Sequence, residues 1–416
     1  MILVNATPSF HSVNFVETFF SSQKKIKQKG GPYHKLNSSV TTAGIYIHVP
    51  FCTIQCMYCD FYTVDLEGNS IPEFVNAVIK EIEYCETDTS GWRFDTIFIG
   101  GGTPSLLDSK SIESIINTLY KKYDLSNIKE CTIESNPNQI TKDRLKDLRR
   151  LGIDRISIGV QSLEPDLLRF LTRDHTIDDV YKTYDHAKIA GFENVNIDML
   201  YNIPGQTVEQ WKIDLERMIK LEPSHISAYE LTVEKGTELH RLVNNGGVSI
   251  PQDPVGTTWL SITSEFLSDR GFLPYEISSF TRSGQECIHN LHYWRVEPCL
   301  AFGPSAHGFD GHRRWKNVSS IKDYLDKIRT SESAVIFDEG LKYKDILNEK
   351  IGLGIRMVEG VDMRKFKEPE LSVLKRNIEK TKNIWPGCIV RNNDHLKLSK
   401  KGILFADSIA VDLMIG

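Results

Sequence analysis

The sequence lacks the features that mark several large classes of protein. It has no run of about 18 or more apolar residues, which argues against a membrane-spanning helix. It has no long Lys/Arg run and a net charge of −5, which argue against a nucleic-acid-binding protein. Its first residues lack the charged start and small-residue cleavage site of a secretory signal. We therefore expect a cytoplasmic protein whose thiols stay reduced.

Cysteines are few, and three of the eight lie in one short stretch, "CTIQCMYC" (52–59). Their spacing is Cys-x3-Cys-x2-Cys, with no fourth cysteine beside them. In a reducing compartment such a cluster indicates a metal or catalytic site rather than disulfides. The scattered Cys85, Cys131, Cys299 and Cys388 are expected to be buried without a chemical role.

Residues 1–42 have no hydrophobic period, and Glu17 is their only carboxylate. The segment is rich in Ser, Lys and Gly, which predicts a disordered N-terminal extension. One alternative is an organelle transit peptide, although the segment lacks the arginines that such peptides favour. Another alternative is an upstream extension of the reading frame.

From residue 43 onwards, short apolar strands alternate with amphipathic helices. This alternation predicts an α/β fold with a parallel sheet covered by helices, and six such units suit a partial (β/α)6 barrel. The barrel is expected over residues 43–235, followed by a barrel extension over 236–340 in which "HNLHYW" lies in an irregular stretch. Residues 341–416 are expected to form a small C-terminal accessory domain, helical or winged. The predicted strands are 44–49, 95–100, 129–135, 154–160, 194–200 and 225–231, and the predicted helices are 72–85, 109–123, 141–152, 178–190 and 207–221.

The residues with unusual chemistry follow the predicted strands. The cysteines come after the first strand and "GGGTPS" (100–105) after the second. Glu134 ends the third strand, Gln161 follows the fourth and Asp198 lies late in the fifth. Barrel enzymes place their active sites at the C-terminal ends of the strands, so these side chains are expected to meet there.

Three clustered thiolates admit two kinds of centre. A structural zinc ion needs four ligands, and His48 is the nearest further candidate in sequence. An iron–sulfur cube held by three cysteines instead leaves one iron open. The spacing, together with Tyr58 before the last cysteine and a preceding strand, resembles the radical S-adenosylmethionine (SAM) superfamily. In that superfamily SAM chelates the open iron of a [4Fe-4S] cluster and is cleaved to a 5′-deoxyadenosyl radical.

The resemblance narrows to one branch. "YIHVPFC", "GGGTPS", "ESNP", "ISIGVQS", "IDMLYNIPGQT", "HISAYEL", "YEIS" and "HNLHYW" occur in the order found in oxygen-independent coproporphyrinogen III oxidases and their relatives, the HemW-type haem chaperones. The resemblance implies that the cluster is held by Cys52, Cys56 and Cys59. It implies SAM contacts from Tyr46, Gly101, Gly102, Thr103, Glu134, Gln161, Arg173 and Asp198. Carboxylates suit the hydroxyl and ammonium groups of SAM, and arginine suits its carboxylate.

Two departures from the oxidases favour the chaperones. The oxidases carry a further cysteine two residues after the third, where this chain has Phe61. "HNLHYW" fits the chaperone pattern His-Asn-x-x-Tyr-Trp, which implies haem binding through His289, with His292 as the alternative ligand. The expected partners are haem, acceptor haemoproteins, an electron donor and, at most peripherally, membrane haemoproteins. A coproporphyrinogen III oxidase and a zinc-binding structural protein remain the alternatives.

Overall fold

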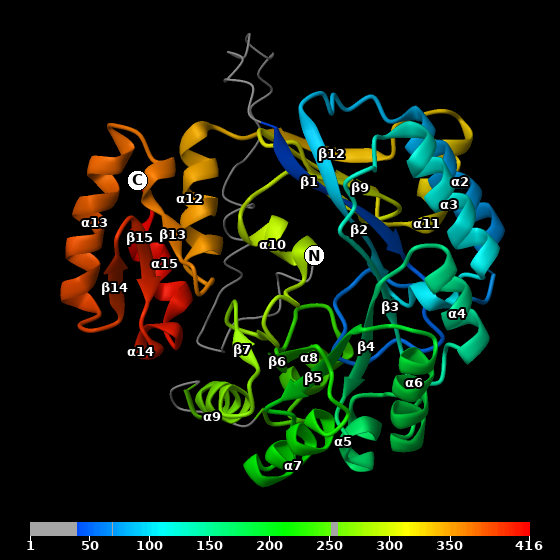
Figure 1. Ribbon diagram of the computed structural model, residues 1–416, viewed down its shortest axis with the longest axis horizontal. Helices are drawn as coiled ribbons and strands as arrows, with labels where there is room; N and C mark the ends of the chain where they lie inside the picture. Colours follow the sequence, from blue (N-terminus) through cyan, green and yellow to red (C-terminus); the bar gives the residue numbers. More distant parts are fainter. Residues whose placement is uncertain (1–39, 69, 251–256) are drawn as a thin grey trace.

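The computed structural model describes residues 40–68, 70–250 and 257–416 (Figure 1). Most of the predicted N-terminal extension, 1–42, therefore lies outside the described residues. Its last two residues, Thr41 and Thr42, are an exception, because they belong to the first strand rather than to a tail. The pairing of Thr41 with Trp92 explains the difference, since the partner lies about fifty residues away and leaves no local signal.

The predicted partial barrel is present, with six consecutive parallel strands followed by a C-terminal domain. Strands β1 to β6 lie side by side in sequence order within a 12-stranded sheet. The strands are β1 (Thr41–Val49), β2 (Trp92–Gly101), β3 (Glu130–Ser135), β4 (Arg155–Gln161), β5 (Asn194–Tyr201) and β6 (His225–Glu230). The helices between them are α2 (Ile71–Tyr84), α3 (Ser109–Lys122), α4 (Lys142–Arg150), α5 (Pro165–Phe170), α6 (Ile177–Ile189) and α7 (Val208–Ile219).

Local sequence signals explain where several of these helices begin. The Thr176 hydroxyl accepts a hydrogen bond from the Asp179 amide, and the Asp179 carboxylate accepts one from the Thr176 amide. Thr207 and Gln210 form the same reciprocal box at the start of α7. These bonds satisfy amides that have no partner within the helix, and so fix the first turn.

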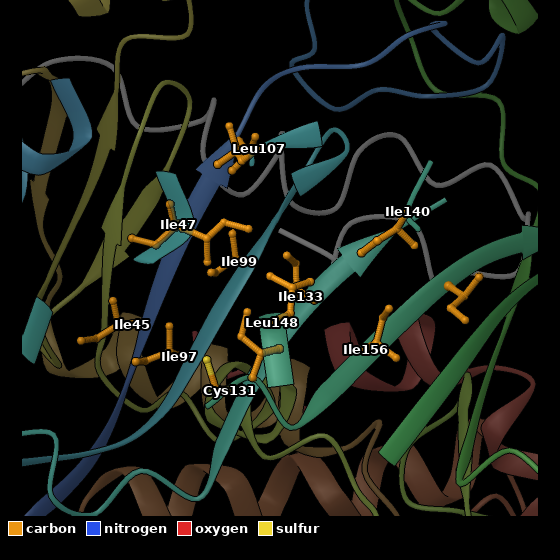
Figure 2. Packing of buried hydrophobic residues seen from close by; sticks show 14 of the residues in the cluster. Ile45, Ile47, Ile97, Ile99, Leu107, Cys131, Ile133, Ile140, Leu148 and Ile156 are labelled. Atoms are coloured by element: carbon orange, nitrogen blue, oxygen red, sulfur yellow. The ribbon is translucent and has the colours of Figure 1, made fainter. Parts of the chain in front are cut away.

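The two faces of the barrel strands differ in chemistry. Side chains alternate along a strand, so Ile45 and Ile47 of β1 and Ile97 and Ile99 of β2 point to the same outer side (Figure 2). There they join one apolar cluster with residues of the covering helices, such as Leu148 of α4. The inner face is left for other residues, and it carries the polar side chains described below.

Residues 236–340 extend the sheet at both edges. On one side β8 (Ser279–Thr281) pairs antiparallel with β6, and on the other β9 (Cys299–Phe302) pairs parallel with β1. The remaining elements are α8 (Glu238–Asn244), α9 (Thr257–Ser268), β7 (Leu273–Pro274), α10 (Ile288–Trp294), β10 (His307–Phe309), β11 (Arg313–Asn317), α11 (Ile321–Arg329) and β12 (Val335–Gly340). The prediction of an irregular "HNLHYW" segment was wrong, because these residues form most of α10. The helix is held by side chains distant in sequence, which a local pattern does not reveal.

The C-terminal domain has its own apolar cluster, which includes Ile351, Leu374 and Leu396. It contains α12 (Tyr343–Gly354), β13 (Val361–Asp362), α13 (Glu370–Ile384), β14 (Ile389–Asn392), β15 (His395–Leu398), α14 (Lys400–Ile403) and α15 (Ala406–Leu413). In Figure 1 these orange and red elements stand to one side of the barrel. The domain limits at about residues 235 and 341 stay a prediction. Among the described residues, no helix combines the length and apolarity needed to cross a membrane.

Candidate cofactor site

The three clustered cysteines lie on the loop between β1 and α2. Phe51, fully buried, anchors the start of this loop, and the Cys52 amide donates to the Val64 carbonyl at 2.9 Å. A tight turn follows, in which the Cys59 amide donates to the Cys56 carbonyl at 3.1 Å. All three thiols line one cavity of about 200 Å³. That volume is below the range of about 300–1,000 Å³ typical of sites that enclose a drug-sized ligand, so the cavity encloses part of a ligand.

The glycines of "GGGTPS" let the end of β2 pack directly against the cysteine loop. The Gly102 amide donates to the Val49 carbonyl at 2.7 Å, and the Thr103 amide donates to the Phe51 carbonyl at 2.7 Å. A Cβ atom on Gly102 would lie 2.5 Å from the Phe51 oxygen and 3.1 Å from the Cys52 sulfur. The cysteine loop alone therefore excludes a side chain at this position, whether or not a ligand also approaches it.

Two carboxylates form one wall of the cavity. Glu134 accepts a hydrogen bond from the Gly101 amide at 3.0 Å. Burial, together with the nearby Asp198, raises the pKa of Glu134 to about 8. Asp198 accepts hydrogen bonds from the Ser157 hydroxyl at 2.7 Å and the Asn196 amide at 2.8 Å. Both side chains are thus held in fixed positions. Asp198 can receive hydroxyl or ammonium donors of a ligand, and Glu134 can do so when it releases its proton, which a cationic ligand would favour.

Arg173 and Gln161 complete the rim beside the cysteines. The Arg173 guanidinium donates to the Cys56 sulfur at 3.3 Å and to the Asn136 side-chain oxygen at 2.6 Å. Gln161 ends β4 with a φ of 70°, in the left-handed region that residues other than glycine seldom occupy. Such backbone strain persists where the surroundings impose it, and it often accompanies a binding site.

Most of the predicted site residues meet at this cavity. Its lining includes Cys52, Cys56, Cys59, Gly101, Gly102, Glu134, Gln161, Arg173 and Asp198. Thr103 lies just behind it, with its hydroxyl 3.6 Å from the Cys52 sulfur. Tyr46 and His289 do not line the cavity, because both are buried behind Phe98, against which their rings stack.

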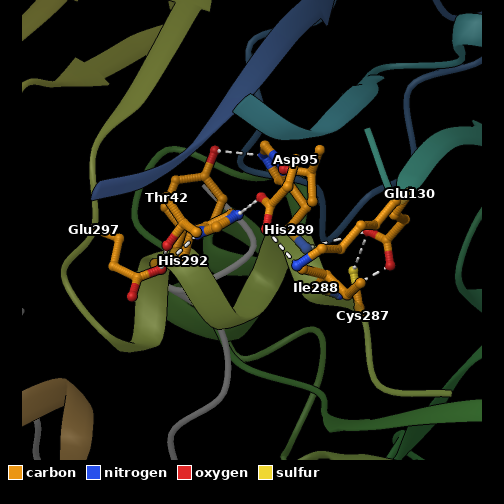
Figure 3. Close-up of polar contacts among 11 residues, drawn as sticks. Thr42, Asp95, Glu130, Cys287, Ile288, His289, His292 and Glu297 are labelled. Carbon is orange, nitrogen blue, oxygen red and sulfur yellow. Dashed lines mark hydrogen bonds and ion pairs between the residues drawn. The ribbon is translucent and has the colours of Figure 1, made fainter. Parts of the chain in front are cut away.

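The position of His289 bears directly on its predicted role. Its side chain is 1% exposed, and its two ring nitrogens lie 2.8 Å from the Thr96 hydroxyl and 3.2 Å from the Tyr293 hydroxyl. Its backbone amide donates to Glu130, which also receives the Ile288 amide (Figure 3). Neither ring nitrogen is available to an iron in this conformation. His289 as a haem ligand stays a prediction, and it requires α10 or its neighbours to move.

His292, the alternative ligand, is also fully engaged. Its ring lies between two carboxylates, with Nε2 at 2.7 Å from Asp95 and Nδ1 at 2.6 Å from Glu297 (Figure 3). Burial alone would lower the pKa of His292, but the two carboxylates raise it to about 9. The ring is therefore an imidazolium, which has no lone pair to offer a metal.

The donor set at the cysteine loop fits a cluster better than a single ion. Within the described residues, no three Cys, His, Asp or Glu side chains are placed to hold one metal ion. A cube does not need such convergence, because each thiolate binds a different iron. Burial raises the pKa of Cys52 and, to about 12, that of Cys59. The thiols would release their protons on binding iron, as metal-bound thiols do.

The residues that line the deeper part of the cavity were not predicted from the sequence. They include Phe98, Arg155, Ser157, Asn196, Ser227, Tyr229 and Asn290. One signal was present in the sequence, because "DRISIGV" and "NVNIDML" place polar residues at alternate positions of otherwise apolar strands. Cys287 was not predicted either; it lies directly before α10 and donates to Glu130 at 3.4 Å.

Comparisons with known proteins all find radical SAM proteins related to HemW and HemN. Residues 46–218 match the radical SAM superfamily, and residues 341–405 match the HemN C-terminal domain. Heme chaperone HemW of Bacillus subtilis is 32% identical over 78% of this chain and 86% of its own. The "Radical S-adenosyl methionine domain-containing protein 1, mitochondrial" of Danio rerio is 30% identical over 97% of this chain and 94% of its own. The solved structure of coproporphyrinogen III oxidase (HemN) from Escherichia coli superposes with a TM-score of 0.78 over 91% of each chain, at 20% identity.

Proposed function

This chain belongs to the HemW family of radical SAM proteins, and from that premise we propose that it binds haem and delivers it to acceptor haemoproteins. The observation that carries the proposal is the similarity to HemW chaperones along most of the chain, at 32% identity to the Bacillus subtilis protein and 34% to that of Lactococcus lactis. Phe61 supports it, because this residue lines the cavity where the oxidases have a further cysteine.

In this proposal the cysteine loop holds a [4Fe-4S] cluster, and the adjoining cavity encloses part of SAM. Cys52, Cys56 and Cys59 would bind the cluster. The SAM contacts implied by the resemblance would come from Gly101, Gly102, Glu134, Gln161, Arg173 and Asp198 on the cavity wall, with Thr103 and Tyr46 behind it. When bound, these groups supply one-electron chemistry, for which an electron donor is a further proposed partner. The protein supplies fixed acidic side chains, an arginine and the cysteine loop.

The alternative is an oxygen-independent coproporphyrinogen III oxidase, and the solved structure of one such enzyme shares this fold over 91% of the chain. Anaerobic incubation of the iron-reconstituted protein with coproporphyrinogen III, SAM and a reductant separates the two functions. We expect haem to bind, as followed by its absorption bands, and no protoporphyrinogen to form over many turnover times. Sustained formation of protoporphyrinogen would instead identify an oxidase.

Haem binding should respond to His289 if this residue is a ligand. We expect His289→Ala to weaken haem binding or to shift the haem absorption bands, while the iron and sulfide content stays that of the parent. The cluster should be unaffected because His289 lies outside the cavity lining and the cysteines lie on another loop. Titration with haem under anaerobic conditions measures both affinity and spectrum.

The control must remove an equally buried imidazole. His225 is fully buried, and its ring nitrogens lie 2.6 Å from Asn196 and 3.0 Å from the Tyr275 hydroxyl. His225→Ala should therefore lower stability about as much as His289→Ala without changing the haem spectrum. If both variants leave the parent spectrum unchanged, His289 is a packing residue and the iron ligand lies elsewhere.

A further inference from the structure

The inner face of β4 runs the full depth of the cavity. Arg155, Ser157, Gly159 and Gln161 occupy alternate positions of this strand, and all four line the cavity. Six residue steps at about 3.3 Å each separate the ends of the strand by about 20 Å. Gln161 lies beside the cysteines, whereas Arg155 lies at the opposite, deep end. The cavity therefore has a floor that is chemically distinct from its rim.

Arg155 is a buried cation without a direct ion-pair partner among the described residues. Its side chain is 2% exposed, and its Nε has no hydrogen-bond partner. In the described part of the chain it forms no ion pair within 4.0 Å. A guanidinium stays charged at any ordinary pH and offers a fork of donors that fits a carboxylate. Glu130 and Asp198 favour the charged guanidinium from beyond ion-pair distance and raise the pKa of Arg155, but neither contacts it. The open Nε on the cavity wall therefore points to an anionic ligand that can make this direct contact.

The nearest carboxylates are committed to other partners. Glu130 accepts the backbone amides of Ile288 and His289 at 2.8 and 3.1 Å, and so anchors α10. Asp198 is held by Ser157 and Asn196 at 2.7 and 2.8 Å. Neither comes within ion-pair distance of Arg155. Both acids are thus held by other groups, and the Arg155 guanidinium is left without a direct carboxylate contact.

Asn290 adds a second unsatisfied group to the same floor. It lines the cavity from α10, is 9% exposed, and its side-chain oxygen has no hydrogen-bond partner. Ser157, Asn196 and Ser227 surround this region with further hydroxyl and amide groups. Buried polar groups in proteins ordinarily have hydrogen-bond partners. Two such groups without partners on one cavity floor therefore indicate a place for a ligand.

We propose that Arg155 and Asn290 form a carboxylate-binding floor that receives a propionate arm of the tetrapyrrole. The inference rests on the proposed haem function and adds the part of the ligand that this chain recognises. The cavity is too small for a whole macrocycle, but a flexible arm with a terminal carboxylate can extend into it. SAM also carries a carboxylate, and Arg173 at the rim, next to Cys56, is placed to receive that one.

The test compares haem with haem dimethyl ester, whose propionates are esterified and uncharged. Binding of each is measured by absorption titration on the full-length, iron-reconstituted protein, and SAM binding is measured in parallel. We expect the parent to bind haem about tenfold to a hundredfold more tightly than the ester, as one charged hydrogen-bonded pair allows. Arg155→Gln should remove this preference and leave SAM affinity unchanged.

Two variants control for loss of structure. Arg155→Lys keeps the charge but not the fork, so it should retain part of the preference for haem even if the glutamine variant does not fold. Arg314→Gln removes a partly buried arginine outside the cavity lining, one whose Nε donates to Glu349 at 3.0 Å. It should leave the preference for haem over the ester as in the parent.

Each remaining outcome overturns a separate statement. Equal affinity of the parent for haem and its ester would overturn the carboxylate floor while leaving haem binding in place. A preference that survives in both Arg155 variants would also overturn it. Weakened SAM binding with an intact haem preference would assign the floor to the SAM carboxylate instead. Absence of haem binding in the parent would overturn the proposed function together with this inference.

Discussion

Replacing Cys52, Cys56 or Cys59 by alanine is expected to abolish the cluster. Two thiolates cannot hold a cube that already has one iron without a protein ligand, and no other cysteine lines the cavity. After anaerobic reconstitution, each of the three variants should contain much less iron and sulfide than the parent protein. SAM binding that depends on the open iron should be lost with the cluster.

Cys85→Ala is the matched control for these variants. Cys85 is a partly exposed free cysteine just after α2, outside the cavity lining. It should keep the parent content of iron and sulfide, because its thiol has no part in the loop. Full occupancy in any of the three loop variants would show that the assignment of that cysteine is wrong.

Asp95→Ala is expected to lower the free energy of unfolding by about 3 kcal/mol, because it leaves the buried imidazolium of His292 short of one of its two carboxylates. Burial by itself would raise the pKa of Asp95, but the hydrogen bond from His292 outweighs it and leaves that pKa below its ordinary value. The pair therefore stabilises the folded chain through charge. Urea unfolding at neutral pH measures the loss.

The same network predicts how stability depends on pH. Below about pH 6.5 His292 is protonated in both folded and unfolded chains, so its contribution is fully present. Between about 6.5 and 9 the unfolded chain loses the proton while the folded chain keeps it, so stability falls. In Asp95→Ala this decline should be weaker. Glu379→Ala, which removes an exposed ion pair with Lys382, should change neither stability nor its pH profile appreciably.

The barrel could be predicted from sequence because its signals are local. Each strand from β1 to β6 is a short, mainly apolar run, and α2, α3, α4, α6 and α7 each begin at a side-chain cap. The short α5 has no such cap and was not predicted. The cysteine loop and its glycines could likewise be placed, since parallel strands bring their C-terminal ends together. The spacing of these residues along the chain was therefore sufficient to predict that they meet at the rim of the cavity.

The deeper part of the site could not be predicted in this way. α10 is seven residues long, and its anchors are Glu130 on β3 and Asp95 on β2, far away in sequence. The polar pairs that occupy His289 and His292 exist only after the sheet has formed. A histidine motif in a sequence therefore indicated ligation, whereas the folded chain shows how both rings are already used.

The short helix α10 contacts both the cavity and the C-terminal domain. Its inner side carries Asn290 on the cavity floor, and at its other end the Trp294 ring packs under the Arg356 guanidinium of the C-terminal domain. Arg295, just after the helix, pairs with Glu359 at 3.0 Å. Seven residues span only about 10 Å of helix. Any shift of the C-terminal domain would therefore reach Asn290 on the cavity floor through this one short helix.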